Sequence, residues 1–190
     1  MSEQLWHRTA GELADLISSK QVSSREVIDA HLERIEEVNG HLNAVTITLT
    51  ERAQAEADAA DAAIAAGEDL GPLHGVPFTI KENIDVAGTA TTSGLPAFAE
   101  MVSAVDAPLV ERMRDAGAVP LGRTNLPELG LRVSTNNPLR GLTRNPWHPD
   151  LTAGGSSGGE GSAIGSGMSP IGLGNDIGGS LRNPAFCCGI

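Results

Sequence analysis

Residues 154–182 read GGSSGGEGSAIGSGMSPIGLGNDIGGSLR, and this stretch decides the fold. The region around it, residues 151–190, holds more than half of the 23 glycines in the chain. Such a composition is often typical of a flexible linker, but apolar residues such as Ile164 and Ile177 interrupt the glycines here. Glycine in that setting indicates close approach of the backbone or unusual φ/ψ angles. The segment is therefore interpreted as part of a packed site.

Upstream of this segment, short apolar runs alternate with a helical pattern. Val76 to Ile80 is typical of a strand and leads directly into Lys81, and residues 118–121 predict a second strand. Between them we expect a helix with Asp106 as its N-cap and Gly117 at its end. Residues 133–155 predict a long irregular loop. This alternation implies an α/β fold with a parallel or mixed sheet.

The first part of the chain, residues 1–70, predicts helices that pack on a core formed by residues 71–190. Thr9 with Glu12, and Ser23 with Glu26, each form the spacing of a capping box before an apolar face. A third helix is expected from Glu51 to about Ala66, where Gly67 can end it.

Composition excludes several classes of protein. The 190 residues include 13 Lys and Arg against 24 Asp and Glu, a net charge of −11, which argues against nucleic acid or an anionic membrane surface as a direct partner. No run of about 18 apolar residues predicts a membrane span, and the N-terminus lacks the pattern of a signal peptide. Cys187 and Cys188 are adjacent, so we interpret them as buried thiols in a reducing cytoplasm. The five histidines share no spacing that predicts a metal site.

Three kinds of chemistry compete for the glycine-rich segment. A P-loop needs a lysine after its glycines, and none follows Lys81. Residues 155–159 match GxSxG with Ser157 at the centre, but no apolar strand precedes them and no histidine follows His148. The third is a serine activated by a lysine, which acts as a base only when desolvation lowers its pKa. Lys81, at the end of an apolar strand, is the candidate base.

Five motifs in order then resemble one enzyme family. They are HGVPFTIKEN (residues 74–83), GRTN (122–125), TRNPW (143–147), GGSSGG (154–159) and DIGGSLR (176–182). Together they are similar to the amidase signature family over about residues 70–190. The run from Gly158 to Arg182, with Glu160 after the glycine pair, most resembles the fatty acid amide hydrolase branch.

The resemblance implies a Ser-Ser-Lys triad. Ser180 matches the nucleophile that forms an acyl-enzyme, Ser156 matches the bridging serine whose preceding peptide bond is cis, and Lys81 matches the base. The N–H groups of residues 177–180 match the oxyanion hole. The residues matched to the oxyanion hole and to substrate binding are Ile177, Gly178, Gly179 and Ser157. The residues matched to support of the turn are Asp176 and Arg182.

The resemblance also implies a fold and an activity. The fold is an α/β/α sandwich around a mixed sheet, which here would stop after the nucleophile and lack the C-terminal half and much of the acyl pocket. The activity is hydrolysis of a small carboxylic amide to an acid and ammonia or an amine, without metal or cofactor, in the cytoplasm. Homodimers are common in the family, and the N-terminal helices could form that interface. The alternatives are the amidase component of a tRNA-dependent amidotransferase (its A-type subunit) and a truncated, non-catalytic interaction module.

Overall fold

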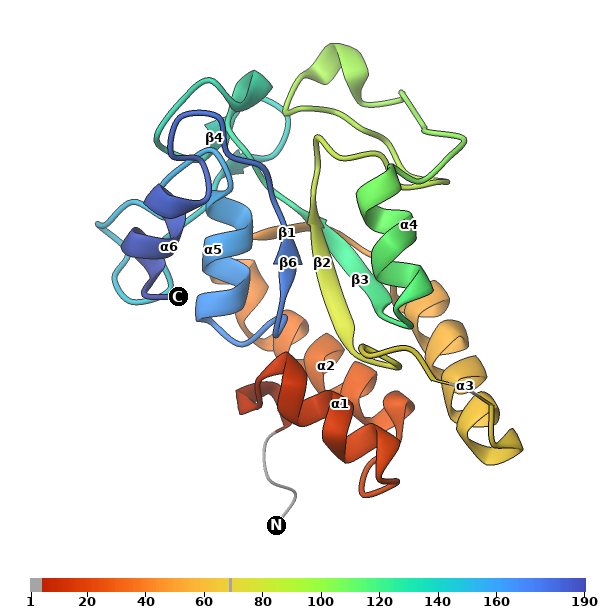
Figure 1. Cartoon of the computed structure of the whole chain (residues 1–190). Coiled ribbons are helices and arrows are strands. Elements are labelled where there is room, and N and C mark those ends of the chain that lie inside the picture. Colours follow the sequence, from red (N-terminus) through yellow and green to blue (C-terminus); the bar gives the residue numbers. More distant parts are fainter. Residues whose placement is uncertain (1–4, 69) are drawn as a thin grey trace.

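The computed structural model describes residues 5–68 and 70–190 (Figure 1). Residues 1–4 and 69, which belong to the expected helical segment 1–70, lie outside the described residues. The main sheet has four strands in the order β1-β3-β2-β6. Their bounds are Val45–Thr48 (β1), Pro77–Lys81 (β2), Val119–Thr124 (β3) and Gly172–Leu173 (β6). Because β2 is parallel to β3 and β6 while β1 is antiparallel to β3, the sheet is mixed, as predicted.

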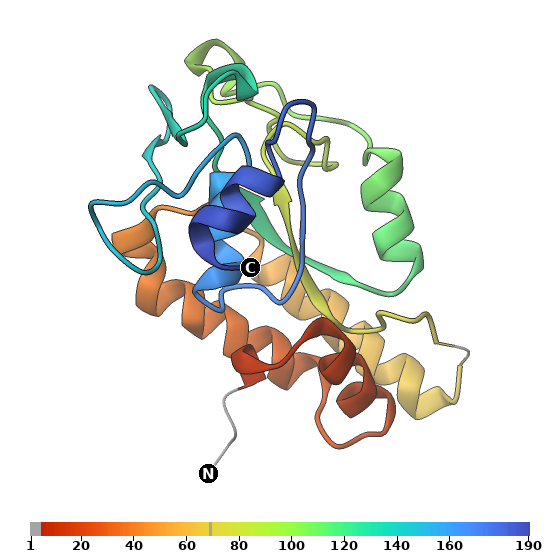
Figure 2. The same ribbon diagram turned by 60° about the vertical axis from the view of Figure 1, so that its left-hand side comes forward.

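Helices cover both faces of this sheet. Figure 1 shows α4 on one side and α5 with α6 on the other, and the turned view in Figure 2 agrees. The helices are Ala10–Ser18 (α1), Ser24–Leu42 (α2), Thr50–Ala66 (α3), Pro108–Asp115 (α4), Gly158–Gly165 (α5) and Arg182–Cys188 (α6). Single 3₁₀ turns occur at Leu5–His7, Pro96–Phe98 and Glu128–Gly130.

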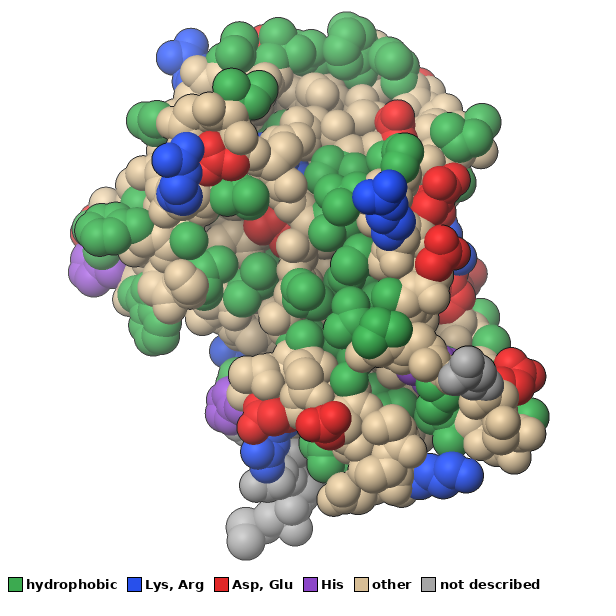
Figure 3. All heavy atoms as spheres, in the orientation of Figure 1, with side chains coloured by type: hydrophobic (Ala, Val, Ile, Leu, Met, Phe, Trp, Pro, Cys, Tyr) green, Lys and Arg blue, Asp and Glu red, His purple; other side chains and the backbone are tan. Residues whose placement is uncertain are grey.

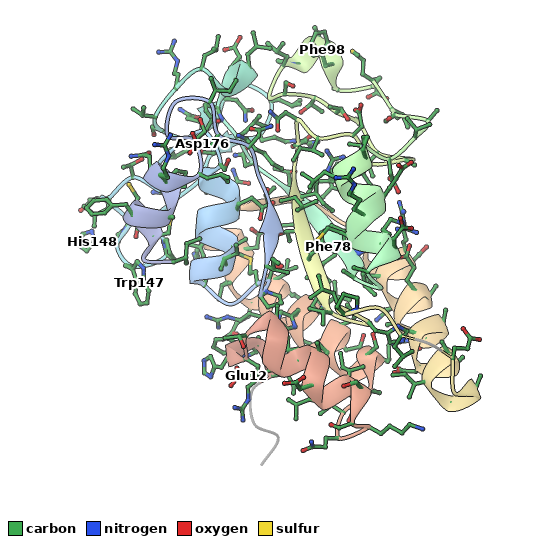
Figure 4. All side chains as sticks on the ribbon, in the orientation of Figure 1. Glu12, Phe78, Phe98, Trp147, His148 and Asp176 are labelled. Carbon is green, nitrogen blue, oxygen red and sulfur yellow. The ribbon has the colours of Figure 1, made fainter. Side chains whose placement is uncertain are left out.

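The core on the two faces of the sheet consists of two separate clusters of buried apolar side chains. Phe78 and Ile80 pack in one cluster with Val110 of α4, and Figure 4 shows Phe78 between the sheet and that helix. Val119 and Leu121 of β3 pack in the other cluster, with residues of α2, α3 and α5. Successive side chains of a strand point to opposite faces. Thr79 and Lys81 therefore face the α5 side.

The capping predictions for the first helices are confirmed. Thr9 and Ser23 each accept a backbone N–H from the glutamate three residues on, and that glutamate accepts the N–H of the cap. Gly67 ends α3 in the left-handed region, with φ 74°.

Two local predictions are corrected. Asp106 is not the N-cap of α4: Ala107 occupies that position and Pro108 is the first helical residue. Oδ1 of Asp106 instead accepts the N–H of Ala87 at 2.7 Å, which ties the loop after β2 to the start of the helix. The expected irregular loop at 133–155 contains a small hairpin, Asn136–Asn137 (β4) paired with Gly141–Leu142 (β5).

The surface carries exposed apolar groups. In Figure 3 apolar side chains form a strip down the middle of the molecule, over β6 and β2. Leu131, Val133, Ile177 and Phe186 are among the exposed large apolar side chains. None of the helices in the described part of the chain is long and apolar enough to cross a membrane.

Candidate active site

Strand β2 delivers a lysine into the interior. All five of its residues are buried, and Lys81, the last, has 0% of its surface exposed. The Nζ of Lys81 donates hydrogen bonds to Oγ of Ser156, at 2.7 Å, and to Oδ1 of Asn175, at 2.8 Å. The first of these contacts joins residues 75 positions apart in the sequence. The fold therefore brings the predicted base and the predicted bridging serine into direct contact.

Ser156 is itself buried at the N-terminal end of α5. The peptide bond between Gly155 and Ser156 is cis, as the resemblance implied. The Gly155 N–H donates to Oδ1 of Asn183 at 3.0 Å, which joins this segment to α6.

Burial lowers the pKa of Lys81 to about 8. The negative charges of Glu160 and Asp176 oppose that change and raise the pKa. An ordinary lysine has a pKa near 10.4. The unprotonated fraction at neutral pH is therefore much larger for Lys81 than for an ordinary lysine. A neutral amine can accept a proton, which is the property that a general base requires.

The turn after β6 is organised by one carboxylate. Asp176 accepts the backbone N–H groups of Gly179 (2.6 Å), Leu181 (3.0 Å) and Arg182 (3.3 Å). The guanidinium of Arg182 adds bonds from Nε at 3.0 Å and Nη2 at 2.9 Å. These contacts, with the Arg182 guanidinium as the largest cause, hold the pKa of Asp176 well below its usual range. Figure 4 shows Asp176 in the loop between β6 and α6.

Ser180 lies on the same cavity as Ser156. That open cavity, of about 590 Å³, is also lined by Asn175, Gly178 and Gly179. The carbonyl of Ser180 accepts the N–H of Ser157 at 3.1 Å, so the turn is held against the start of α5. Although both serines are described, no hydrogen bond joins their hydroxyl groups.

The four N–H groups predicted for the oxyanion hole are not equivalent. The N–H of Gly179 donates to Asp176. The N–H groups of Ile177, Gly178 and Ser180 have no acceptor among the described residues, and all three residues line the cavity. Free N–H groups beside a nucleophile can stabilise a developing oxyanion.

Two other predicted site residues, Ser157 and Arg182, are not part of the cavity lining. Ser157 is buried, and its Oγ has no hydrogen-bond partner within residues 5–68 and 70–190. Arg182 is exposed and contacts the turn through Asp176. Across the same described residues, no group of three or more His, Cys, Asp and Glu side chains could hold a metal ion.

Two polar residues of this site were not predicted from the sequence as site residues. Asn175 accepts the second hydrogen bond of Lys81, and the only signal for it is its position next to Asp176 in the motif. Glu160, quoted for the resemblance alone, is 4% exposed and contacts both β2 and β3.

Comparison with known proteins shows the family of the chain. The profile of the Amidase family matches residues 26–190, so the chain belongs to the amidase family. An indoleacetamide hydrolase of Bradyrhizobium diazoefficiens is 50% identical over 98% of this chain and 36% of its own length. The A-type subunit of the glutamyl-tRNA(Gln) amidotransferase of Moorella thermoacetica is 44% identical over 98% of this chain and 38% of its own length.

Solved structures give the same result. A fatty acid amide hydrolase superimposes with a TM-score of 0.93 at 32% identity, covering 97% of this chain and 33% of that one. The chain therefore spans little more than a third of the length of these relatives.

Proposed function

We propose that this protein hydrolyses a small carboxylic amide through an acyl-enzyme on Ser180, with Ser156 and Lys81 as its proton relay. The observation that carries the proposal is the 2.7 Å contact between Lys81 Nζ and Ser156 Oγ beside the cavity that Ser180 lines. A buried lysine with a pKa of about 8 can serve as base where no histidine is present.

In the proposed first step, neutral Lys81 takes the proton of Ser156 while Ser156 takes that of Ser180. The freed Ser180 Oγ forms a bond to the amide carbon, and the carbonyl oxygen becomes an oxyanion facing the free N–H groups of Ile177 and Gly178. A hydroxyl can donate and accept at the same time, so Ser156 is suited to pass the proton.

In the second step the C–N bond breaks, and the leaving amine receives the proton through Ser156 from Lys81. Water then attacks the acyl carbon and loses a proton through Ser156 to Lys81. The bond from that carbon to Ser180 Oγ breaks, the acid leaves, and Lys81 returns the proton through Ser156 to Ser180 Oγ. The cycle returns each group to its starting state, and it needs no cofactor.

Among substrates, an arylacetamide is the first choice. The relative with 50% identity is named an indoleacetamide hydrolase, and exposed apolar side chains such as Leu131 and Ile177 line the cavity. The second candidate is a glutaminase subunit of an amidotransferase, which the 44% identical relative favours. A small-molecule amide is the partner in both, and a cytoplasmic location remains part of the proposal.

The test is intact-mass labelling of the chain with a fluorophosphonate, compared with Ser180→Ala. One adduct on the wild type that is absent from the variant supports an activated serine at position 180. Ser18→Ala is the control, because it removes an exposed serine hydroxyl on α1, outside the cavity lining, and should keep the adduct.

Ammonia release then separates the two candidates. Release from indole-3-acetamide supports the arylacetamide hydrolase, and release from glutamine alone supports the amidotransferase component. The absence of an adduct, both on this chain and on a version extended at its C-terminus, would contradict the hydrolase and support a non-catalytic module.

A further inference from the structure

A second charged residue lies behind the base. Glu160 of α5 is almost fully buried, yet its carboxylate accepts two hydrogen bonds, from Oγ1 of Thr79 and Oγ1 of Thr124, both at 2.7 Å. Thr79 belongs to β2 and Thr124 to β3. The carboxylate therefore bridges the two central strands.

These two threonines flank Lys81 on one face of the sheet. Thr79 precedes Lys81 by two residues on β2, so both side chains point to the same face. Thr124 is the direct partner of Lys81 in the register between β2 and β3. A carboxylate bonded to both threonines is thus held next to the stem of Lys81.

The segment that leads into α5 makes a second contact with this strand. Ser156 contacts Lys81, and Glu160, four residues later, contacts Thr79. The two contacts form parallel connections between the strand and the start of α5. A change in the position of Glu160 would therefore also move Ser156 relative to Lys81.

Strand β6 leaves space for the carboxylate of Glu160 at Gly172. A Cβ at Gly172 of β6 would lie 2.0 Å from Oε2 of Glu160, so only glycine fits there. Glu160 is consequently enclosed by β2, β3 and β6, away from water that could screen its charge.

We propose that Glu160 is a positioning residue that holds a proton on Lys81 when it is ionised and releases the lysine as a base when it is protonated. This inference rests on the proposed function of Lys81. Burial raises the pKa of Glu160 to about 7, and the charge of Lys81 lowers it. The two groups therefore titrate in overlapping ranges and affect each other.

Three other charged groups lie around the pair. Asp176, in the turn after β6, also raises the pKa of Lys81. Arg123, on β3, lowers the pKa of Glu160. Glu82, next to Lys81 on the chain, forms its ion pair with Arg140 at 2.7 Å. No side chain of these three bonds to the hydroxyl of Thr79 or of Thr124, and both hydroxyls donate to Glu160, so Glu160 is the charge to change.

The chain suits a direct test because it has two lysines, Lys20 and Lys81. With lysine labelled with carbon-13 at Cε, an NMR pH titration gives one buried signal and one exposed reference from Lys20. In Glu160→Gln, which keeps an acceptor and a donor for the two threonines, we expect the Lys81 midpoint to fall by on the order of one pH unit. The Lys20 midpoint should not change.

Thr46→Val is the matched control, since it removes a threonine hydroxyl that donates to another buried carboxylate, that of Glu82, and leaves Glu160 and its two threonines in place. It should leave the Lys81 midpoint within a few tenths of a unit of the wild-type value. An unchanged Lys81 midpoint in Glu160→Gln would overturn the proposal. So would a wild-type Lys81 midpoint near 10.4, the value of an ordinary lysine, which can be measured even where a variant fails to fold.

The titration requires no turnover, so the two proposals fail separately. A lowered midpoint, with no fluorophosphonate label on this chain or on the version extended at its C-terminus, supports the coupling and contradicts the hydrolase. An unchanged midpoint in a chain that is labelled at Ser180 contradicts the coupling alone.

Discussion

Gly172 and Glu160 are in a relationship that only glycine permits: a Cβ at position 172 would lie 2.0 Å from Oε2 and 2.8 Å from Cδ of the glutamate. The same Cβ would lie 3.1 Å from Oγ1 of Thr79, which donates to that carboxylate. The carboxylate cannot move away without losing a hydrogen bond in a buried site. Strand β6 can therefore pack against Glu160 only because residue 172 is a glycine.

Gly172→Ala should destabilise the fold and disturb the base. Overpacking of this kind costs about 1–3 kcal/mol, which a urea unfolding curve at pH 7.5 will measure. Gly178→Ala is a suitable control for stability, because a Cβ there meets nothing within 4 Å. Equal unfolding midpoints for both variants would contradict the packing argument.

The rate of acylation should rise with pH through the titration of Lys81. The neutral lysine is the active form, and its pKa of about 8 places the midpoint of that rise near pH 8. The measurement is the rate of fluorophosphonate labelling from pH 6 to 10. Lys81→Met should reduce the rate by about 10²-fold or more, whereas Lys20→Met should not change it. A labelling rate independent of pH would contradict Lys81 as the base.

Asp176 should matter more than its ion-pair partner. Asp176→Ala releases three backbone N–H groups that hold the turn, so labelling of Ser180 should slow by about 10–100-fold. Arg182→Gln leaves those three bonds in place, and the lost pair is exposed, so its effect should stay within about threefold. Circular dichroism will show whether both variants remain folded. An equal loss in the two variants would assign the effect to the ion pair instead.

The N-terminal helices could be predicted because their signals are local. Thr9 and Ser23 each find their capping partner three residues away, and the structure contains both boxes. The strand that ends at Lys81 was also predicted, since its apolar run is short and continuous. Such patterns need no knowledge of the rest of the chain.

Helix α5 could not be predicted in this way. Its sequence, GGEGSAIG, contains four glycines, and glycine is a poor helix former. Tertiary packing determines it instead: a Cβ at Gly158 would lie 2.3 Å from Oγ1 of Thr135, and one at Gly159 would lie 2.3 Å from the backbone N of Asn125. The glycines are there because other segments pass close to the helix.

The candidate site, too, could be predicted only where its signals are local in the sequence. The sequence places Lys81 at the end of a strand, but the partners of its amine lie 75 and 94 residues away. The motifs indicated Ser156 through resemblance, whereas Asn175 had only its position next to Asp176 as a signal. The N–H of Gly179 was predicted to face an oxyanion, and its bond to Asp176 depends on how the turn closes. Contacts of this kind are properties of the folded chain.

His31 provides a last prediction, on stability at acid pH. It is fully buried in α2, its Nδ1 lies 2.8 Å from the carbonyl oxygen of Val27, and its Nε2 has no partner among the described residues. Burial lowers its pKa to about 4, below the value near 6.5 of an unfolded histidine. The unfolded chain therefore binds a proton first as the pH falls. Stability that is fully present above pH 6.5 should be lost toward pH 4, by on the order of 3 kcal/mol.

His31→Leu removes the titrating group while it fills a similar volume. Its free energy of unfolding should change less between pH 7 and pH 4.5 than that of the wild type, measured by urea titration at each pH. Ile35→Leu is the control, because it alters a buried side chain of the same helix without removing a titrating group, and it should keep the pH dependence of the wild type. If His31→Leu loses as much stability as the wild type on acidification, the acid sensitivity arises from other groups, and the buried imidazole does not determine it.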